Sequence, residues 1–230
     1  MFFGTDIDAK TIMKRKSLIL SLLFISFGLF SQTEIKNGIV IDKGAKKIVD
    51  DVVAQMKKDT PFSFSFTYDI QDEDGKAQGR GTFLSNNAKY AITTDNFSYF
   101  SNGTTVWNYI KKTNEVEIMD VEDGNTMFNF IKIINTSIKD FRPKLIRQEN
   151  FNKIKCNIVD LTPMKNGNIS KIRIYSSVAD NRLQKMEIHT YSRSKYIYTF
   201  SNHSNKKNVS EKDFIFSSDK FPNIKIVDLR

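Results

Sequence analysis

Apolar and polar side chains alternate strictly in one early segment of the chain. In residues 61–70, "PFSFSFTYDI", every second position is apolar, and Ser, Thr or Asp fills the positions between. Side chains of a strand repeat every two residues, so the segment predicts a strand with one apolar and one polar face. The apolar face must cover either the protein's own core or something that the protein carries. Its members are Phe62, Phe64, Phe66, Tyr68 and Ile70.

Residues 42–58 show helical spacing. Their apolar side chains recur at steps of three and four, from Ala45 to Met56, which predicts an amphipathic helix. Asp42 is a suitable N-cap, and Lys57 and Lys58 suit the C-terminal end of the helix dipole. Pro61 prevents the helix from continuing.

Short alternating segments make up most of the remaining chain, and Asp74-Gly75 and Asn102-Gly103 are typical hairpin turns. Residues 125–141, "NTMFNFIKIINTSIKDF", are apolar at helical steps on nearly all sides and predict a helix that covers a greasy surface. The C-terminus predicts two short extended pieces around Pro222. The expected strands are residues 62–70, 79–84, 89–94, 97–101, 105–110, 115–120, 155–162, 169–176, 183–190 and 195–201.

Sequential antiparallel strands in this number twist and curl into a concave sheet. The two helices are the only elements available to cover its apolar side. We therefore expect a mainly β fold with helices. Its strongly curved antiparallel sheet would be covered by an N-terminal helix and a central helical lid.

The first 31 residues have the features of a leader. Lys14, Arg15 and Lys16 precede a 13-residue apolar run, Leu18 to Phe30, which is too short to span a bilayer as a helix. This pattern is typical of a secretory signal peptide that is cut near Ser31, with Met13 as the true start. We expect residues 1–31 to be removed and residues 32–230 to form a single domain.

Composition narrows the functional classes. The formal net charge is +9, but basic residues are interspersed with acidic ones, which favours a solvated basic surface over a nucleic-acid site. The single cysteine, Cys156, excludes a disulfide framework, and its strand-like surroundings predict a buried thiol. Stability must then come from a large core.

Catalytic patterns are weak in this sequence. His189 reads as a strand residue beside Glu187, and His203 lies in the polar segment "SNHSNKK", which predicts a loop. No His, Cys and carboxylate set has metal-ligand spacing, and no phosphate loop or nucleophile elbow is present. We expect no enzyme activity, no metal and no cofactor. A secreted hydrolase with dispersed catalytic residues is the least favoured of the possible functions.

Four segments in order resemble the LolA family of periplasmic carriers for outer-membrane lipoproteins. They are "FSFSFTYDIQDEDGKAQGRGTFL", "FSYFSNGTTVWNYIKKTNEVEI", "CNIVDLTPMKNGNISKIRIYSS" and "DFIFSSDKFPNIKIVDLR". The leader ending in "FSQ" and the final "VDLR" are similar to Bacteroidetes-type members. The resemblance spans about residues 40 to 230. It implies an unclosed half-barrel whose cavity, under helices, takes lipoprotein acyl chains.

The resemblance also implies a soluble periplasmic monomer that binds no nucleic acid. Its partners would be lipoprotein acyl chains, an inner-membrane lipoprotein-releasing ABC transporter similar to LolCDE, and an outer-membrane acceptor that is similar to LolB or unknown. The alternative is a periplasmic lipid-sensing or protein-interaction module on the same fold. The expected acyl-chain-binding residues are Phe62, Phe64, Phe66, Tyr68, Phe83, Trp107, Met127, Phe128, Ile131 and Ile134.

One departure from the family pattern concerns the lid. Proteobacterial carriers have an Arg-Pro pair after the Gly-rich turn, and the Arg helps to hold the lid. Here the matching segment "TFLSNNAKY" has Asn86 and Asn87 and no Arg. Lid control by that residue therefore does not transfer to this chain.

Overall fold

The computed structural model describes residues 33–36, 39–73, 75–121, 140–206 and 208–230. The contacts divide the chain into Met1–Gln32 and Thr33–Arg230, and all described residues belong to the second unit. The expected leader, residues 1–31, lies outside the described residues. So does most of the expected lid, including Met127, Phe128, Ile131 and Ile134.

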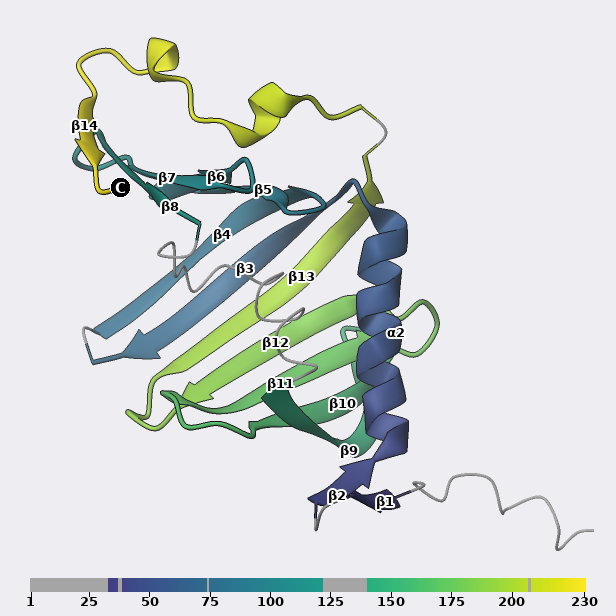
Figure 1. Ribbon diagram of the computed structural model, residues 1–230. Coiled ribbons are helices and arrows are strands. Elements are labelled where there is room, and N and C mark those ends of the chain that lie inside the picture. Colours follow the sequence, from purple (N-terminus) through teal and green to yellow (C-terminus); the bar gives the residue numbers. More distant parts are fainter. Residues whose placement is uncertain (1–32, 37–38, 74, 122–139, 207) are drawn as a thin grey trace, which may run out of the picture. The chain divides into compact units, whose positions relative to one another are not determined.

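A single 12-stranded sheet dominates the described part of the chain (Figure 1). All neighbouring strands in it run antiparallel, except that β14 pairs in parallel with β8. The two end strands, β14 and β9, do not pair with each other, so the curved sheet stays open. The expectation of a curved antiparallel sheet that does not close into a barrel is confirmed. Strand order is β14-β8-β7-β6-β5-β4-β3-β13-β12-β11-β10-β9.

The strand bounds agree well with the alternation pattern. Strands β5 to β8 and β12 begin and end at the expected residues. The strands of the sheet are β3 (Phe62–Asp72), β4 (Gly75–Asn86), β5 (Lys89–Thr94), β6 (Phe97–Ser101), β7 (Thr105–Ile110), β8 (Glu115–Asp120), β9 (Phe141–Phe151), β10 (Ile154–Pro163), β11 (Ile169–Ser177), β12 (Leu183–Thr190), β13 (Lys195–Asn205) and β14 (Lys225–Asp228).

Three elements differ from the expectation. Strand β9 was not predicted, because "FRPKLIRQENF" contains Pro143 and several charges; both are tolerated at a sheet edge. The C-terminal segment forms one strand, β14, and two 3-10 helices, η1 (Glu211–Phe214) and η2 (Ser218–Lys220). Near the N-terminus, β1 (Thr33–Lys36) and β2 (Ile39–Asp42) form a separate antiparallel hairpin.

Helix α2 (Lys43–Asp59) begins and ends as its sequence predicts. Asp42 Oδ1 accepts a hydrogen bond from the Ala45 N–H at 2.9 Å, and Lys57 and Lys58 occupy the last turn. The other oxygen of Asp42, Oδ2, accepts from the Leu145 N–H of β9 at 3.0 Å. One carboxylate therefore caps the helix and fixes it to the edge of the sheet. No helix among the described residues has the length and apolar character needed to cross a membrane.

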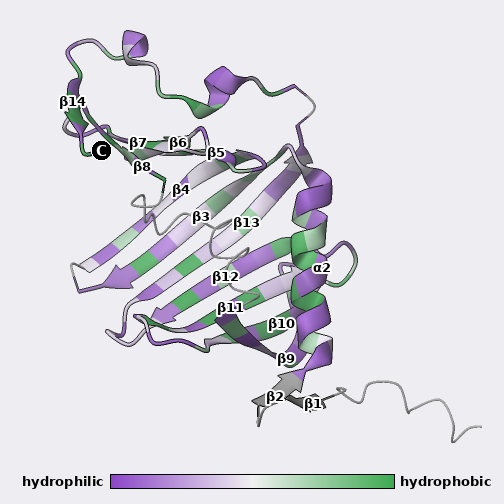
Figure 2. Ribbon diagram, in the orientation of Figure 1, coloured by the Kyte–Doolittle hydropathy of each residue, from purple (hydrophilic) through white to green (hydrophobic). Residues whose placement is uncertain are grey.

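Helix α2 lies across one end of strands β13 to β9 (Figure 1). Its buried residues Ala45, Val49 and Val53 join the main hydrophobic cluster with the apolar side chains of the sheet. We call the side of the sheet that faces this cluster the inner face, and the opposite side the outer face. Apolar and polar positions alternate along the strands of the sheet (Figure 2), and the apolar positions point to the inner face. The apolar face predicted for residues 62–70 is this inner face.

Candidate functional site

The aromatic centre of the inner face comes from neighbouring strands in register. Phe64 of β3 lies opposite Phe83 of β4, and their rings stack with centroids 4.8 Å apart. Phe62 lies 6.0 Å from Phe83, and Phe200 of β13 meets Phe64 edge-on at 5.0 Å. Such pairs contribute stability beyond the area that they bury. Adjacent strands thus build a continuous aromatic surface.

Two glycines explain how part of this surface is filled. A Cβ at Gly79 would lie 2.5 Å from the Tyr68 Oη, and a Cβ at Gly81 would lie 2.7 Å from Phe66 Cζ. The rings of Tyr68 and Phe66 therefore lie directly on the backbone of β4. Phe66 is 1% exposed. The Gly-x-Gly spacing in this strand provides room for two core rings.

Two neighbouring cavities lie at the C-terminal end of α2, and Met56 and Phe62 line both. The larger holds about 450 Å³, within the range typical of small-molecule sites. The smaller holds about 20 Å³, enough for one small group. The larger cavity is lined by Val53, Met56, Lys57, Thr60, Phe62, Ser85, Asn87 and Ala88. The smaller is lined by Gln55, Met56, Asp59, Phe62, Phe64, Arg182, Leu183 and His203.

The structure therefore divides the expected acyl-binding residues. Phe62 lines both cavities and Phe64 lines the smaller one. Phe66, Tyr68 and Phe83 belong to the adjoining core cluster and line neither of them. Met127, Phe128, Ile131 and Ile134 lie outside the described residues.

Trp107 was expected beside these phenylalanines, but the strand register places it on the outer face. Trp107 pairs with Phe100 of β6, and Phe100 pairs with Ala91 of β5. Ala91 in turn pairs with Leu84 of β4. Cross-strand partners share a face, and Leu84 alternates with Phe83 along β4, so Trp107 and Phe83 point to opposite sides. The alternation within each strand does not reveal whether residues of two different strands lie on the same face of the sheet.

Charged side chains close the end of the smaller cavity. Arg182 Nε donates to Asp59 Oδ2 at 3.0 Å, Gln55 Nε2 donates to Asp59 Oδ1 at 2.9 Å, and Asn205 Nδ2 donates to the same oxygen at 3.2 Å. Burial alone would raise the pKa of Asp59, but the Arg182 hydrogen bond and the other donors outweigh it, so the pKa lies below its ordinary value. The carboxylate is thus saturated with donors and its charge stays fixed.

Sequence reasoning missed the polar residues that line the smaller cavity, which are Gln55, Asp59, Arg182 and His203. His203 was expected in a loop, but β13 continues to Asn205. A β-bulge sets Asn202 and His203 together opposite Phe64, since Ser201 pairs with Ser65 and Ser204 pairs with Ser63. Asn202 has a φ of 52°, a left-handed conformation that Asn tolerates well. That Asn was the only sequence signal of the bulge.

The bulge turns His203 toward the inner face. With regular alternation, Phe200 points inward and His203 would point outward. Instead the His203 ring lies 5.7 Å from the Phe64 ring. Burial lowers the pKa of His203, although a hydrogen bond with the Leu183 backbone partly opposes this shift. Among the described residues, its Nε2 atom is buried and has no hydrogen-bond partner.

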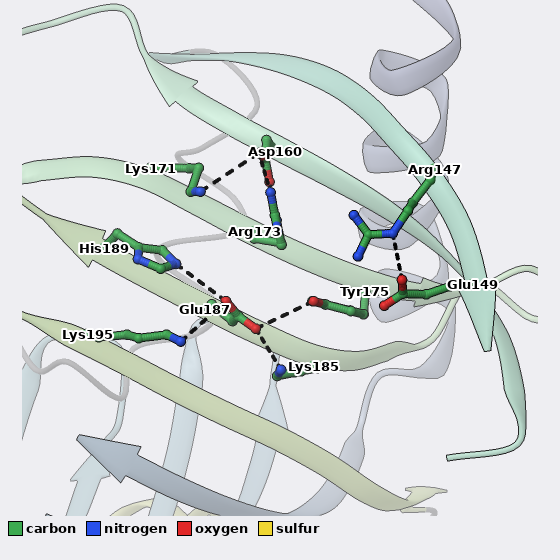
Figure 3. Close-up of polar contacts among 10 residues, drawn as sticks. All are labelled: Arg147, Glu149, Asp160, Lys171, Arg173, Tyr175, Lys185, Glu187, His189 and Lys195. Carbon is green, nitrogen blue, oxygen red and sulfur yellow. Dashed lines mark hydrogen bonds and ion pairs between the residues drawn. The ribbon is translucent and has the colours of Figure 1, made fainter. Parts of the chain in front are cut away.

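A second polar cluster lies on the outer face of β10 to β13 (Figure 3). Glu187 contacts Lys185 Nζ at 2.6 Å, His189 Nε2 at 3.4 Å and Lys195 Nζ at 4.0 Å. Burial would raise the pKa of Glu187, but the Lys185 hydrogen bond and the charges of Lys185 and Lys195 hold it below its ordinary value. Asp160 is paired likewise with Arg173 at 2.6 Å. Glu187 is therefore held ionised by neighbouring cations, and both carboxylates take part in structural ion pairs.

The remaining candidates for chemistry in the described part of the chain are a metal site and the thiol of Cys156. No group of three or more His, Cys, Asp or Glu side chains there could hold a metal ion. Cys156 is fully buried, as expected, beside Ile158 and Tyr175, and burial raises the pKa of its thiol. A buried thiol that stays protonated is a poor nucleophile.

Comparison with solved structures gives the fold. A conserved uncharacterised protein from Thermus thermophilus matches with a TM-score of 0.55 at 11% identity, covering 80% of this chain and 99% of that one. A putative outer-membrane lipoprotein-sorting protein domain from Vibrio parahaemolyticus matches at 0.45 and 13%, covering 75% and 96%. The LolA superfamily protein NE2245 from Nitrosomonas europaea matches at 0.39 and 13%, covering 75% and 97%.

At these levels of sequence identity, the similarity to solved structures indicates the fold of the chain and does not indicate its function. No family model matches the sequence, and a search of curated proteins found no match.

Proposed function

We propose that the protein is a periplasmic carrier that binds lipoprotein acyl chains on the inner face of its sheet. It would move them from an inner-membrane releasing transporter to an outer-membrane acceptor. The observation that carries this proposal is the cavity of about 450 Å³ at the C-terminal end of α2, which is lined by Phe62 of the aromatic surface. Transfer of acyl chains out of water is favourable by about 0.8 kcal/mol per CH₂, so such a cavity binds them without a catalytic group.

The position of the cavity supports handover. It lies between the end of a helix and the β4–β5 turn, where Thr60, Ser85 and Asn87 form a polar border. Met56, which lines both cavities, has an unbranched side chain that adapts to different chain shapes. A cavity with a polar border and an adaptable wall suits a ligand that must be both taken up and released.

Displacement of a fluorescent fatty-acyl probe tests this function. The probe should bind the purified mature chain, and lipoprotein should displace it. Phe62→Ala should weaken probe binding because Phe62 lines both cavities. Tyr191→Ala, at a side chain that is 72% exposed, is the matched aromatic control and should leave binding unchanged. Absence of probe binding to the wild-type chain would contradict the proposal.

A protein-interaction module is the second candidate. It is favoured by the C-terminal edge of the sheet, where Ile226 and Leu229 are 54% and 60% exposed on and just after β14. Native mass spectrometry of protein purified from its own periplasm separates the two functions. Co-purified lipoprotein or lipid indicates a carrier, and a stoichiometric protein partner indicates an interaction module.

A further inference from the structure

Lys57 is the charged residue of the larger cavity. Among the described residues that line this cavity, it alone carries a formal charge, and none of them is a carboxylate. Lysine commonly packs its methylene stem along an apolar wall and keeps its ammonium group in water. The Lys57 side chain is exposed, so its ammonium group is open to the polar end of a ligand whose chain lies in the cavity.

The ammonium group of Lys57 lacks an anionic partner. Lys47, on the same helix, pairs with Asp51 four positions later at 2.7 Å. The residues four positions before and after Lys57 are Val53 and Pro61, so the helix offers no carboxylate at the spacing that such pairs need. No hydrogen bond or ion pair joins the Lys57 ammonium group to another of the described residues.

Other polar groups at the border of the cavity are used by the protein's own backbone. Thr60 Oγ1 donates to the Met56 carbonyl at 3.1 Å, and the Thr60 N–H donates to the Lys57 carbonyl at 3.3 Å. Ser85 Oγ donates to the Lys89 carbonyl at 3.3 Å. These helix carbonyls are therefore satisfied without the Lys57 ammonium group, which leaves a cation at the border for a ligand.

We propose that Lys57 pairs with an anionic group, a carboxylate or a phosphate, at the head of an amphiphile whose chain fills the larger cavity. The chain lies against Val53, Met56 and Phe62, and the head stays at the border beside Lys57. Opposite charges attract and like charges repel, so the site favours anionic over cationic heads. This adds fatty acids and acidic lipids to the ligands of the cavity, and it rests on the proposed acyl-chain binding.

Four competitors with one chain length test this proposal: decanoate, decyl phosphate, decylamine and decanol. Each is used at neutral pH to displace a fluorescent acyl probe from the mature chain. Decanol is the uncharged reference within each protein, which cancels any change in the affinity of the probe. In Lys57→Met, decanoate should lose roughly two- to fivefold relative to decanol, the range of one partly exposed ion pair. Protonated decylamine should gain in the same variant.

Lys58→Met is the matched control. Lys58 lies in the same last turn of α2, is also exposed and does not line the cavity. The substitution therefore removes the same charge from the same helix end without changing the site, and decanoate should compete as it does in the wild-type chain. Added salt should weaken decanoate relative to decanol in the wild-type chain, because salt screens a partly exposed pair. Lys57→Met should show less of this salt dependence.

The outcomes separate this inference from the function on which it rests. Equal losses in Lys57→Met and Lys58→Met would overturn the role of Lys57, because the overall positive charge would then explain the preference. An unchanged ratio of decanoate to decanol in Lys57→Met would overturn it as well and leave acyl binding intact. Failure of the probe to bind the wild-type chain would overturn both. A larger loss for decyl phosphate than for decanoate indicates a phosphate head, and the reverse indicates a carboxylate.

Discussion

Arg182 Nε donates to Asp59 Oδ2 at 3.0 Å and joins the last residue of α2 to the start of β12, 123 positions later in the chain. Asn205, at the end of β13, bonds to both partners. This contact fixes the C-terminal end of the helix beside the two cavities. At the other end, the Asp42 carboxylate fixes the helix to β9. The helix is therefore held at both ends by carboxylates.

Arg182→Met should lower the free energy of unfolding by about 1–3 kcal/mol, because Asp59, whose side chain is 11% exposed, loses its cationic partner. Urea denaturation measures this loss. Arg80→Met is the control: Arg80 and Asp95 are 82% and 68% exposed and lie 3.9 Å apart, so its effect should stay within about 0.5 kcal/mol. Equal effects of the two substitutions would show that the Asp59 contact has no special role.

Gly81→Ala should destabilise the protein, because the added Cβ would lie 2.6 Å from the Thr93 carbonyl oxygen and 2.7 Å from Phe66 Cζ. Neither a paired backbone nor a packed ring moves easily, so we expect a cost of about 1–3 kcal/mol. Gly167→Ala is the matched control, since nothing lies within 4 Å of its added Cβ. Thermal unfolding of the two variants checks the difference, and an unchanged melting temperature for Gly81→Ala would contradict it.

Phe66→Ala should cost about 3–5 kcal/mol of stability, as large-to-small changes in a packed core do, because Phe66 is 1% exposed. Phe62→Ala should cost less stability and more acyl-probe affinity, since one side of Phe62 already faces the cavities. Chemical denaturation and probe titration of both variants separate the two effects. If Phe66→Ala lost affinity more than Phe62→Ala did, the site would lie further along β3.

Acidification should destabilise the protein as the pH falls through the ordinary histidine pKa of 6.5 and below it. Burial lowers the pKa of His203 and of His189 below the ordinary value of 6.5. As the pH is lowered, these histidines therefore bind protons in the unfolded chain before they do so in the folded chain. The free energy of unfolding decreases as a result. His203→Phe should reduce this slope, and His189→Gln should remove most of the rest. Urea denaturation across this range checks it. An unchanged slope in both variants would contradict the burial of these rings.

Cys156 should react very slowly with a thiol reagent in the folded protein. It is fully buried, and burial raises the pKa of its thiol, so neither access nor thiolate is available. After unfolding in urea, the chain should react with one equivalent of the thiol reagent, because it has one cysteine. Fast stoichiometric reaction without urea would show that the apolar cluster of Cys156, Ile158 and Tyr175 opens readily.

The sequence by itself determined the elements that depend on neighbouring residues. Alternation over residues 62–70 and helical spacing over residues 42–58 each reflect one local geometry, so both were predicted correctly. The cap at Asp42 and the turn at Asn102-Gly103 are local in the same sense, since each is formed within a few residues. Strand β9 was not predicted, because an edge strand buries few side chains and its apolar and polar residues do not alternate strictly.

Only the tertiary structure decided which side chains meet. Trp107 and Phe64 both lie in well-predicted strands, but the register across four intervening ladders places them on opposite faces. His203 reached the inner face through one extra residue in β13, and a single residue reverses every side chain beyond it. The Asp59–Arg182 contact joins positions 123 residues apart. Faces, registers and long-range pairs depend on how strands align in space, which no local pattern encodes.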